Sequence, residues 1–192
     1  MTRALRTLVL TALAALALSG NAQAAGGNYV VDGGTAKQRG QVKAALNASA
    51  FNWSVVPAQI KIHVARVGQS KAVPGEIWID SQLLNSGRFA WGVVQHEYAH
   101  QVDFFLFDTA TRSLLATLLG GKAWCWETAG LKHDEYGCER FASTLAWAYW
   151  PAKDSAMRPD SKSSESASMA PARFRTLMAQ ILGAAALSTK NR

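Results

Sequence analysis

Acidic residues are scarce in this 192-residue chain, and none occurs before Asp32. Lys and Arg together number 20 against 13 Asp and Glu, which gives a formal net charge of +7. This excess predicts a weak attraction to anionic cell surfaces. The sequence also lacks a basic stripe interleaved with aromatic residues and any recognisable nucleic-acid-binding module, so we expect no nucleic-acid partner.

Long apolar runs are also lacking, because the longest one, at residues 8–18, is too short to span a bilayer comfortably. Arg3 and Arg6 precede this run and Ala22-Gln23-Ala24 follows it, which is the pattern of a cleaved signal peptide over residues 1–24. A retained membrane anchor is the alternative. We therefore predict a secreted or periplasmic protein without a transmembrane anchor, in which residues 25–192 form a single domain and a monomer.

Cysteine is limited to Cys125 and Cys138, and no Cys-x-x-Cys motif is present. In an exported chain such a pair predicts one disulfide bond. The alternative is that the two thiols are metal ligands, which their spacing does not favour.

Histidine is also rare, with four in the chain, and two of these stand four residues apart as His96-Glu97-Tyr98-Ala99-His100. On an α-helix a step of four residues returns to the same face, so both imidazoles can bind one metal ion. Glu97 then lies beside the metal, where it can accept a proton from a metal-activated water. The alternative is a solvated helix in which this spacing is a coincidence.

Hydrophobic periodicity and turn residues predict an α+β domain. It has a short mixed sheet, an edge strand packed on the HExxH helix, and further C-terminal helices. The expected edge strand is residues 76–80, along which an extended substrate could pair. The Ser-rich residues 153–168 are expected to form a flexible loop. The other predicted elements are a short strand within 25–34, a strand at 60–67, and helices at 35–50, 88–105, 111–119, 138–150 and 171–187.

A third metal ligand is needed, because catalytic zinc usually takes three protein ligands and leaves one position for water. Glu139 stands in an otherwise apolar predicted helix, where a carboxylate is costly unless it is paired or bound to metal. Glu139 is therefore the predicted third ligand. The rival candidates lie in the preceding loop and are His133, Asp134 and Glu135.

Two stretches together resemble the gluzincin zinc metallopeptidases. They are His-Glu-Tyr-Ala-His-Gln-Val-Asp at 96–103 and, about 40 residues later, Tyr-Gly-Cys-Glu-Arg-Phe-Ala at 136–142. Within that group the sequence is most similar to the catalytic core of the lethal-factor-type toxin proteases. The resemblance covers roughly residues 60–150 and implies a small zincin-like domain.

The resemblance implies a role for each motif residue. The zinc ligands would be His96, His100 and Glu139, and Glu97 would be the general base. Tyr136 would donate to the oxyanion that develops on the substrate, with His133 as the alternative donor. Asp103 would support a ligand or pack the helix. Ser143 departs from the family pattern, because many relatives carry at this position an acid that orients a ligand histidine.

These observations predict an exported zinc-dependent metallopeptidase that hydrolyses peptide bonds in a protein or peptide substrate. The alternative is a non-catalytic exported module that binds zinc or attaches to a surface. A third possibility is a zinc amidase that acts on a cell-wall bond. Glu97 discriminates between the first two, because a pure binding site has no need of a carboxylate beside the open coordination position.

Overall fold

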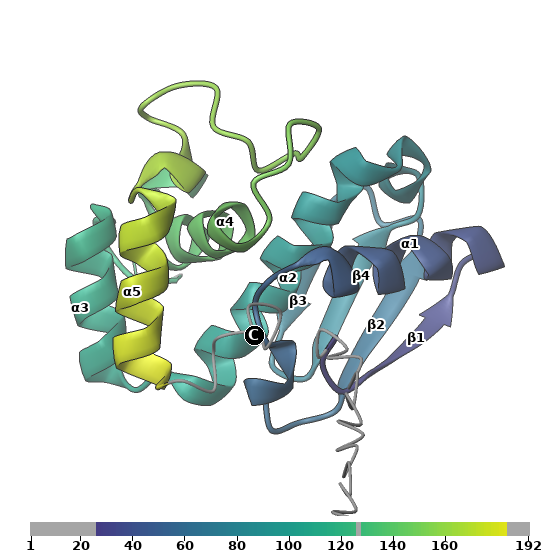
Figure 1. The fold of residues 1–192 in the computed structure, drawn as a ribbon, viewed down its shortest axis with the longest axis horizontal. Helices are drawn as coiled ribbons and strands as arrows, with labels where there is room; N and C mark the ends of the chain where they lie inside the picture. Colours follow the sequence, from purple (N-terminus) through teal and green to yellow (C-terminus); the bar gives the residue numbers. More distant parts are fainter. Residues whose placement is uncertain (1–25, 126–127, 184–192) are drawn as a thin grey trace, which may run out of the picture.

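A computed structural model describes residues 26–125 and 128–183 (Figure 1). The predicted signal peptide at 1–24 lies outside these residues. The described chain forms one four-stranded mixed sheet and five α-helices, which confirms the α+β class and the mixed sheet expected from the sequence. Within the described residues no helix is long and apolar enough to cross a membrane.

The sheet has the strand order β1-β2-β4-β3. Its strands are β1 (Tyr29–Gly33), β2 (Ile60–Ala65), β3 (Lys71–Val73) and β4 (Glu76–Asp80). Strands β1, β2 and β4 are parallel to one another, and β3 is antiparallel to β4. The prediction that residues 76–80 form the edge is therefore wrong, because β4 is paired on both sides. The edge strands are β1 and β3, and β3, at three residues, is too short to show an alternating pattern in the sequence.

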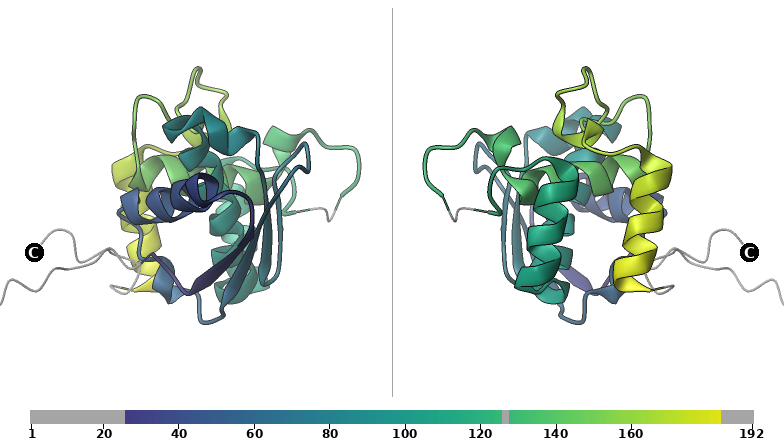
Figure 2. Two further views of the ribbon diagram at one scale, coloured as in Figure 1. Left: turned by 90° about the vertical axis from the view of Figure 1, so that its right-hand side faces the viewer. Right: turned by 90° about the vertical axis from the view of Figure 1, so that its left-hand side faces the viewer.

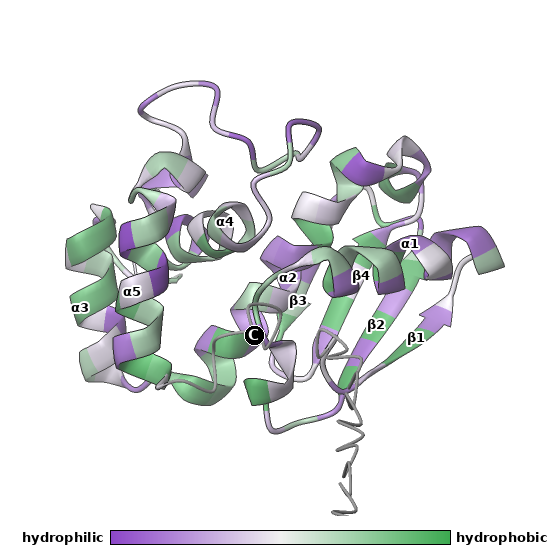
Figure 3. Ribbon diagram, viewed as in Figure 1, coloured by the Kyte–Doolittle hydropathy of each residue, from purple (hydrophilic) through white to green (hydrophobic). Residues whose placement is uncertain are grey.

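One face of the sheet is buried and the other is open to solvent. Along β2 the side chains alternate: Ile60, Ile62 and Val64 are buried, whereas Lys61 and Ala65 are exposed. Figure 3 shows the same alternation of hydrophobic and hydrophilic residues along the strands. Helices α1 (Ala36–Ala48) and α2 (Arg88–Leu106) pack against each other and against the sheet. The sheet thus provides a stable base for the motif helix.

The motif helix α2 is buried along most of its length, from Val94 to Asp103. Its Gln101 side chain is bonded to the β3–β4 hairpin, since it donates to the carbonyls of Val73 and Glu76 and accepts from the N–H of Gly75. An edge strand therefore packs on the HExxH helix, but it is β3 and not the expected residues 76–80. These three hydrogen bonds fix the position of β3 relative to the motif.

The C-terminal helices build the other half of the core around α4 (Gly137–Tyr149). Helices α3 (Thr109–Leu119) and α5 (Pro171–Leu182) both pack on α4, at the end of the molecule away from β1 (Figures 1 and 2). Gly120 ends α3 in the left-handed conformation at φ 73°, which glycine adopts without steric cost. Helix α4 also packs on α2, which places the two predicted ligand-bearing helices in contact.

The predicted disulfide between Cys125 and Cys138 is present. Cys138 lies in the first turn of α4, next to Glu139, and Cys125 lies in the long connection between α3 and α4. The same connection carries the short 3-10 helix η3 (His133–Glu135). The disulfide therefore fixes this connection at the base of the helix that carries Glu139.

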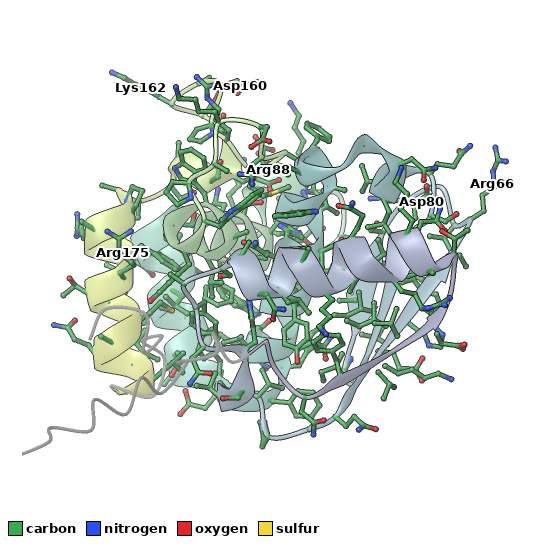
Figure 4. All side chains as sticks on the ribbon, turned by 45° about the vertical axis from the view of Figure 1, so that its right-hand side comes forward. Arg66, Asp80, Arg88, Asp160, Lys162 and Arg175 are labelled. Atoms are coloured by element: carbon green, nitrogen blue, oxygen red, sulfur yellow. A yellow bond between two sulfur atoms is a disulfide. The ribbon has the colours of Figure 1, made fainter. Side chains whose placement is uncertain are left out.

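Residues 153–168 run over the surface, but several contacts attach them to the core. The N–H of Ala156 donates to the carbonyl of Phe89 in α2, and a Cβ on Gly92 would lie 2.5 Å from Ser155 Oγ. Gly92 therefore permits close packing of this segment on α2. Near its other end the segment forms the 3-10 helix η4 (Glu165–Ala167), in which Ser166 is buried. Asp160 and Lys162 lie between these attachments, on its outermost part (Figure 4).

Asp80 organises the loops at one end of the sheet, near Arg66 (Figure 4). One of its carboxylate oxygens accepts from the N–H groups of Val67 and Gly68, and the other accepts from Gln82 and Leu83. Burial would raise the pKa of this carboxyl, but the four backbone donors lower it overall. Asp80 thereby holds the 66–70 loop in place.

We expect Asp80→Asn to lower the free energy of unfolding by about 1–3 kcal/mol, because an amide N–H₂ group would face backbone donors. The stabilisation by Asp80 is present above the unfolded-state pKa and is lost as the pH falls through the lower folded-state pKa. The difference in unfolding temperature between wild type and variant should therefore shrink in acid. Asp32→Asn, which changes an exposed carboxylate, is the control. Equal unfolding temperatures at pH 7 for wild type and Asp80→Asn would contradict this role.

Candidate metal centre

Helix α2 places His96 and His100 on one face, one turn apart, and both side chains are buried. Their Nε2 atoms lie 3.2 Å apart. The rings meet edge to face at an interplanar angle of 83°. Two imidazole nitrogens so close together are stabilised by a cation or a shared proton between them, since two lone pairs repel. The helix alone therefore provides a bidentate nitrogen site.

Helix α4 adds a carboxylate to this pair. Oε2 of Glu139 lies 3.1 Å from His96 Nε2 and 3.4 Å from His100 Nε2. Two ligand atoms bound tetrahedrally at 2.0–2.1 Å from zinc lie about 3.3 Å apart. The three measured separations of 3.1, 3.2 and 3.4 Å agree with this value. The structure thus brings together the three ligands predicted from the sequence, and together they fit one tetrahedral ion.

We call His96, His100 and Glu139 the metal-ligand trio. The charges of Glu139 and His96 stabilise each other. Burial opposes the ionisation of Glu139, but the hydrogen bonds to His100 and His96 outweigh it and lower the pKa of the carboxyl. Burial also opposes a charge on His96, yet Glu139 and the neighbouring carboxylates raise the pKa of the imidazole. The two histidines thus keep Glu139 ionised in this buried setting, which is the state in which a carboxylate can bind a metal ion.

Glu97 points into the same region but differs from Glu139 in its surroundings. It is buried, and within the described part of the chain its carboxylate accepts no hydrogen bond. Burial raises the pKa of Glu97, and the charge of Glu139 adds to this effect, whereas His96 and His100 lower it. A carboxylate without a protein donor and with a raised pKa is suited to accept a proton from water.

The metal-ligand trio and Glu97 line a cleft of about 550 Å³. One wall of the cleft is the 68–72 segment, which includes the start of the edge strand β3, and other walls come from α2, α4 and the 153–168 segment. The lining is mixed, with apolar side chains such as Val93, Phe104 and Met157 beside the polar groups. A cleft next to a metal site gives a substrate access to it.

His133, one of the predicted catalytic residues, lines this cleft from η3. Its Nε2 lies 3.2 Å from Glu139 Oε2, and its Nδ1 lies 2.6 Å from Glu165 Oε1. The hydrogen bond to Glu165 raises the pKa of His133 to about 9, so the ring is a cation at neutral pH. Half of the side chain is exposed, which allows it to face a bound substrate.

Tyr136, the other predicted oxyanion donor, is buried in the core, and its hydroxyl donates to the carbonyl of Thr128. Of the two predicted oxyanion donors, His133 lines the cleft, whereas Tyr136 is not among the described residues that line it. Asp103 is buried below the site and accepts from Arg112 Nε and Trp124 Nε1, so it joins α2 to α3 and to the long connection. The structure therefore brings five of the six predicted site residues together.

Two further residues at the site were not predicted as functional. Ser143 Oγ lies 3.0 Å from His96 Nδ1 and 2.7 Å from Glu165 Oε2. In the sequence Ser143 stands out only as a departure from the gluzincin pattern, and Glu165 lies in a Ser-rich stretch that has no periodic signal. The resemblance connects position 143 with a ligand histidine, but no pattern in the sequence connects residue 165 with either of them.

Comparisons of the chain with known protein families, curated proteins and solved structures find no significant match. The assignment of function therefore depends on the geometry and chemistry of this site.

We expect the purified protein to bind one equivalent of zinc. At a free zinc concentration 100 times the dissociation constant, the folded state gains about 2.7 kcal/mol, which raises the unfolding temperature. His100→Ala should remove this shift, and zinc affinity should fall in acid because all three ligands must be deprotonated. His63→Ala, which alters a histidine that stacks on Trp78, is the control and should bind zinc normally. Metal analysis together with thermal unfolding, with and without a chelator, checks these outcomes.

Proposed function

We propose that this protein is an exported zinc-dependent metallopeptidase with a zincin-like, gluzincin-type site. The observation that carries the proposal is the convergence of His96, His100 and Glu139, with Glu97 beside them and without a hydrogen bond to described protein groups. A site that only stabilises the fold has four protein ligands and is closed to water. Here the trio faces a cleft, which favours catalysis over a purely structural site.

The residues of the site divide the reaction between them. Zinc held by the trio would supply a Lewis acid that acidifies water and polarises a carbonyl group. Glu97 would accept the proton of the attacking water and later deliver it to the leaving amine. His133, cationic through its pairing with Glu165, would stabilise the negative charge that develops on the carbonyl oxygen. The proposal assigns this last role to His133 because Tyr136 donates its hydroxyl to Thr128.

The placement of β3 supports a peptide as the substrate. The strand is paired with β4 on one side, and its other side is the edge of the sheet. Lys71 and Ala72 of this strand line the cleft together with the trio. An extended peptide could pair with this edge and so present a peptide bond to Glu97.

The alternative is a non-catalytic module that binds zinc, and a cell-wall amidase is a third candidate with the same metal chemistry. Glu97 separates the first alternative from the peptidase, since it has no role in a binding module. An assay of unstructured protein and of peptidoglycan separates the two enzymes.

Replacing Glu97 by Gln is expected to lower hydrolysis of an unstructured protein by about 10²- to 10⁴-fold, because the general base is lost. Zinc content should stay at one equivalent, since Glu97 is not a ligand. Activity should be measured by peptide release at saturating zinc, with metal analysis on the same samples. If zinc-loaded wild type cleaves neither unstructured protein nor peptidoglycan, the binding module is the correct function.

His133→Ala is expected to lower kcat by about 10²- to 10³-fold without loss of zinc, because a cationic donor to the oxyanion is removed. Tyr136→Phe should leave kcat close to that of wild type and lower the free energy of unfolding by about 0.5–1.5 kcal/mol, because its hydroxyl bonds to a backbone carbonyl. Steady-state kinetics and thermal unfolding of both variants check this pair. If Tyr136→Phe lowers kcat more than His133→Ala does, the oxyanion role belongs to Tyr136.

A further inference from the structure

Ser143 connects a metal-ligand histidine to a carboxylate that comes from a remote part of the chain. Its hydroxyl lies 2.7 Å from Glu165 Oε2 and 3.0 Å from His96 Nδ1. The pKa of Glu165 is lowered, because the hydrogen bonds from His133 and Ser143 outweigh the effect of burial, so Glu165 is an ionised group that only accepts. The single hydroxyl proton of Ser143 therefore goes to Glu165, and the serine oxygen accepts from His96.

This direction of hydrogen bonding fixes the tautomer of His96. A proton held at Nδ1 leaves the lone pair of Nε2 directed to the place where His100 and Glu139 converge. Such support orients a metal-ligand imidazole and increases its basicity. His100 has no equivalent, because its buried Nδ1 has no hydrogen-bond partner in the described part of the chain. The support is thus specific to one of the two imidazoles.

Glu165 itself is held in a fixed position. Thr144 Oγ1 donates to its backbone carbonyl, and so does Ser168 Oγ. Helix η4, which begins at Glu165, packs on α4. The second carboxylate oxygen of Glu165, Oε1, lies 2.6 Å from His133 Nδ1. One carboxylate thus reaches both a metal ligand, through Ser143, and the cationic histidine at the mouth of the site.

We propose that Glu165 is a positioning residue that serves both halves of the site: through Ser143 it orients His96 for zinc, and through its other oxygen it orients His133 for the substrate. The inference rests on the proposed function, since it assumes that the trio holds zinc. It goes beyond that function because it places the support of the metal centre in the Ser-rich 153–168 segment.

Zinc affinity tests the arm through Ser143. Glu165→Ala and Ser143→Ala should each weaken zinc binding about 10- to 100-fold, measured by competition with a chromophoric chelator. Glu165→Gln keeps an oxygen that can accept from Ser143, so its affinity should lie between those of wild type and Glu165→Ala. Asp154→Ala is the matched control, because it removes a carboxylate of the same segment that pairs with Arg88 away from the site. It should bind zinc as wild type does.

Activity at saturating zinc tests the arm through His133. Glu165→Ala should then show a lower kcat than Ser143→Ala, because it disturbs His133 as well as His96. His133→Ala should show the opposite pattern to Ser143→Ala, because its kcat should fall while its zinc affinity stays at that of wild type. A residue that only stabilises the fold would not produce this division between affinity and turnover. The unfolding temperatures of the metal-free variants show that each one is folded, and Ser143→Ala with Glu165→Gln carry the test if Glu165→Ala does not fold.

The outcomes separate the two proposals. Wild type that binds no zinc would overturn both the proposed function and this inference. Wild type that binds zinc, together with Glu165→Ala and Ser143→Ala that bind it within about twofold as tightly, would overturn the inference alone. A loss of affinity in Asp154→Ala as large as that in Glu165→Ala would also overturn it, because the effect would then belong to the segment as a whole.

Discussion

The packing of α4 against α2 is the contact on which the rest of the site depends. It places the carboxylate of Glu139 within 3.1 and 3.4 Å of two imidazole nitrogens in a buried setting. A carboxylate in that setting is costly unless a positive charge compensates it. The packing of the two helices therefore forms a group of three donor atoms that could hold a metal ion, and the proposal of zinc follows from the identity of these donors.

The trio was predictable from the sequence because each member lies on a periodic helix and carries a recognisable local signal. His96 and His100 repeat at helical spacing, and Glu139 is a charge in an otherwise apolar helix. The boundaries of α2 and α4 were predicted to within a few residues, because these helices are long and periodic. The local sequence pattern is sufficient to predict a ligand that lies on a regular helix or strand whose buried face can be identified.

The edge strand and the support of His96 were not predictable in the same way. Strand β3 spans only three residues, too few to show an alternating pattern, and it is held to the motif helix by the hydrogen bonds of Gln101, which is distant in sequence. Glu165 reaches the site because η4 packs on α4, and a Ser-rich stretch gives no sign of such packing. Tyr136 was chosen from its place next to the Glu139 motif, but the chain direction at the start of α4 takes its hydroxyl to Thr128.

The site thus combines two kinds of support. Its metal ligands lie on long packed helices, which hold side chains more accurately than loops do. Two further polar groups, His133 and Glu165, lie on short 3-10 helices within irregular connections, and each connection is attached by a different interaction. The Cys125–Cys138 disulfide attaches the first connection at the base of α4, and the packing of η4 on α4 attaches the second to the same helix. Because both attachments are made to α4, the helix that carries Glu139 also sets the positions of the two groups that lie around it.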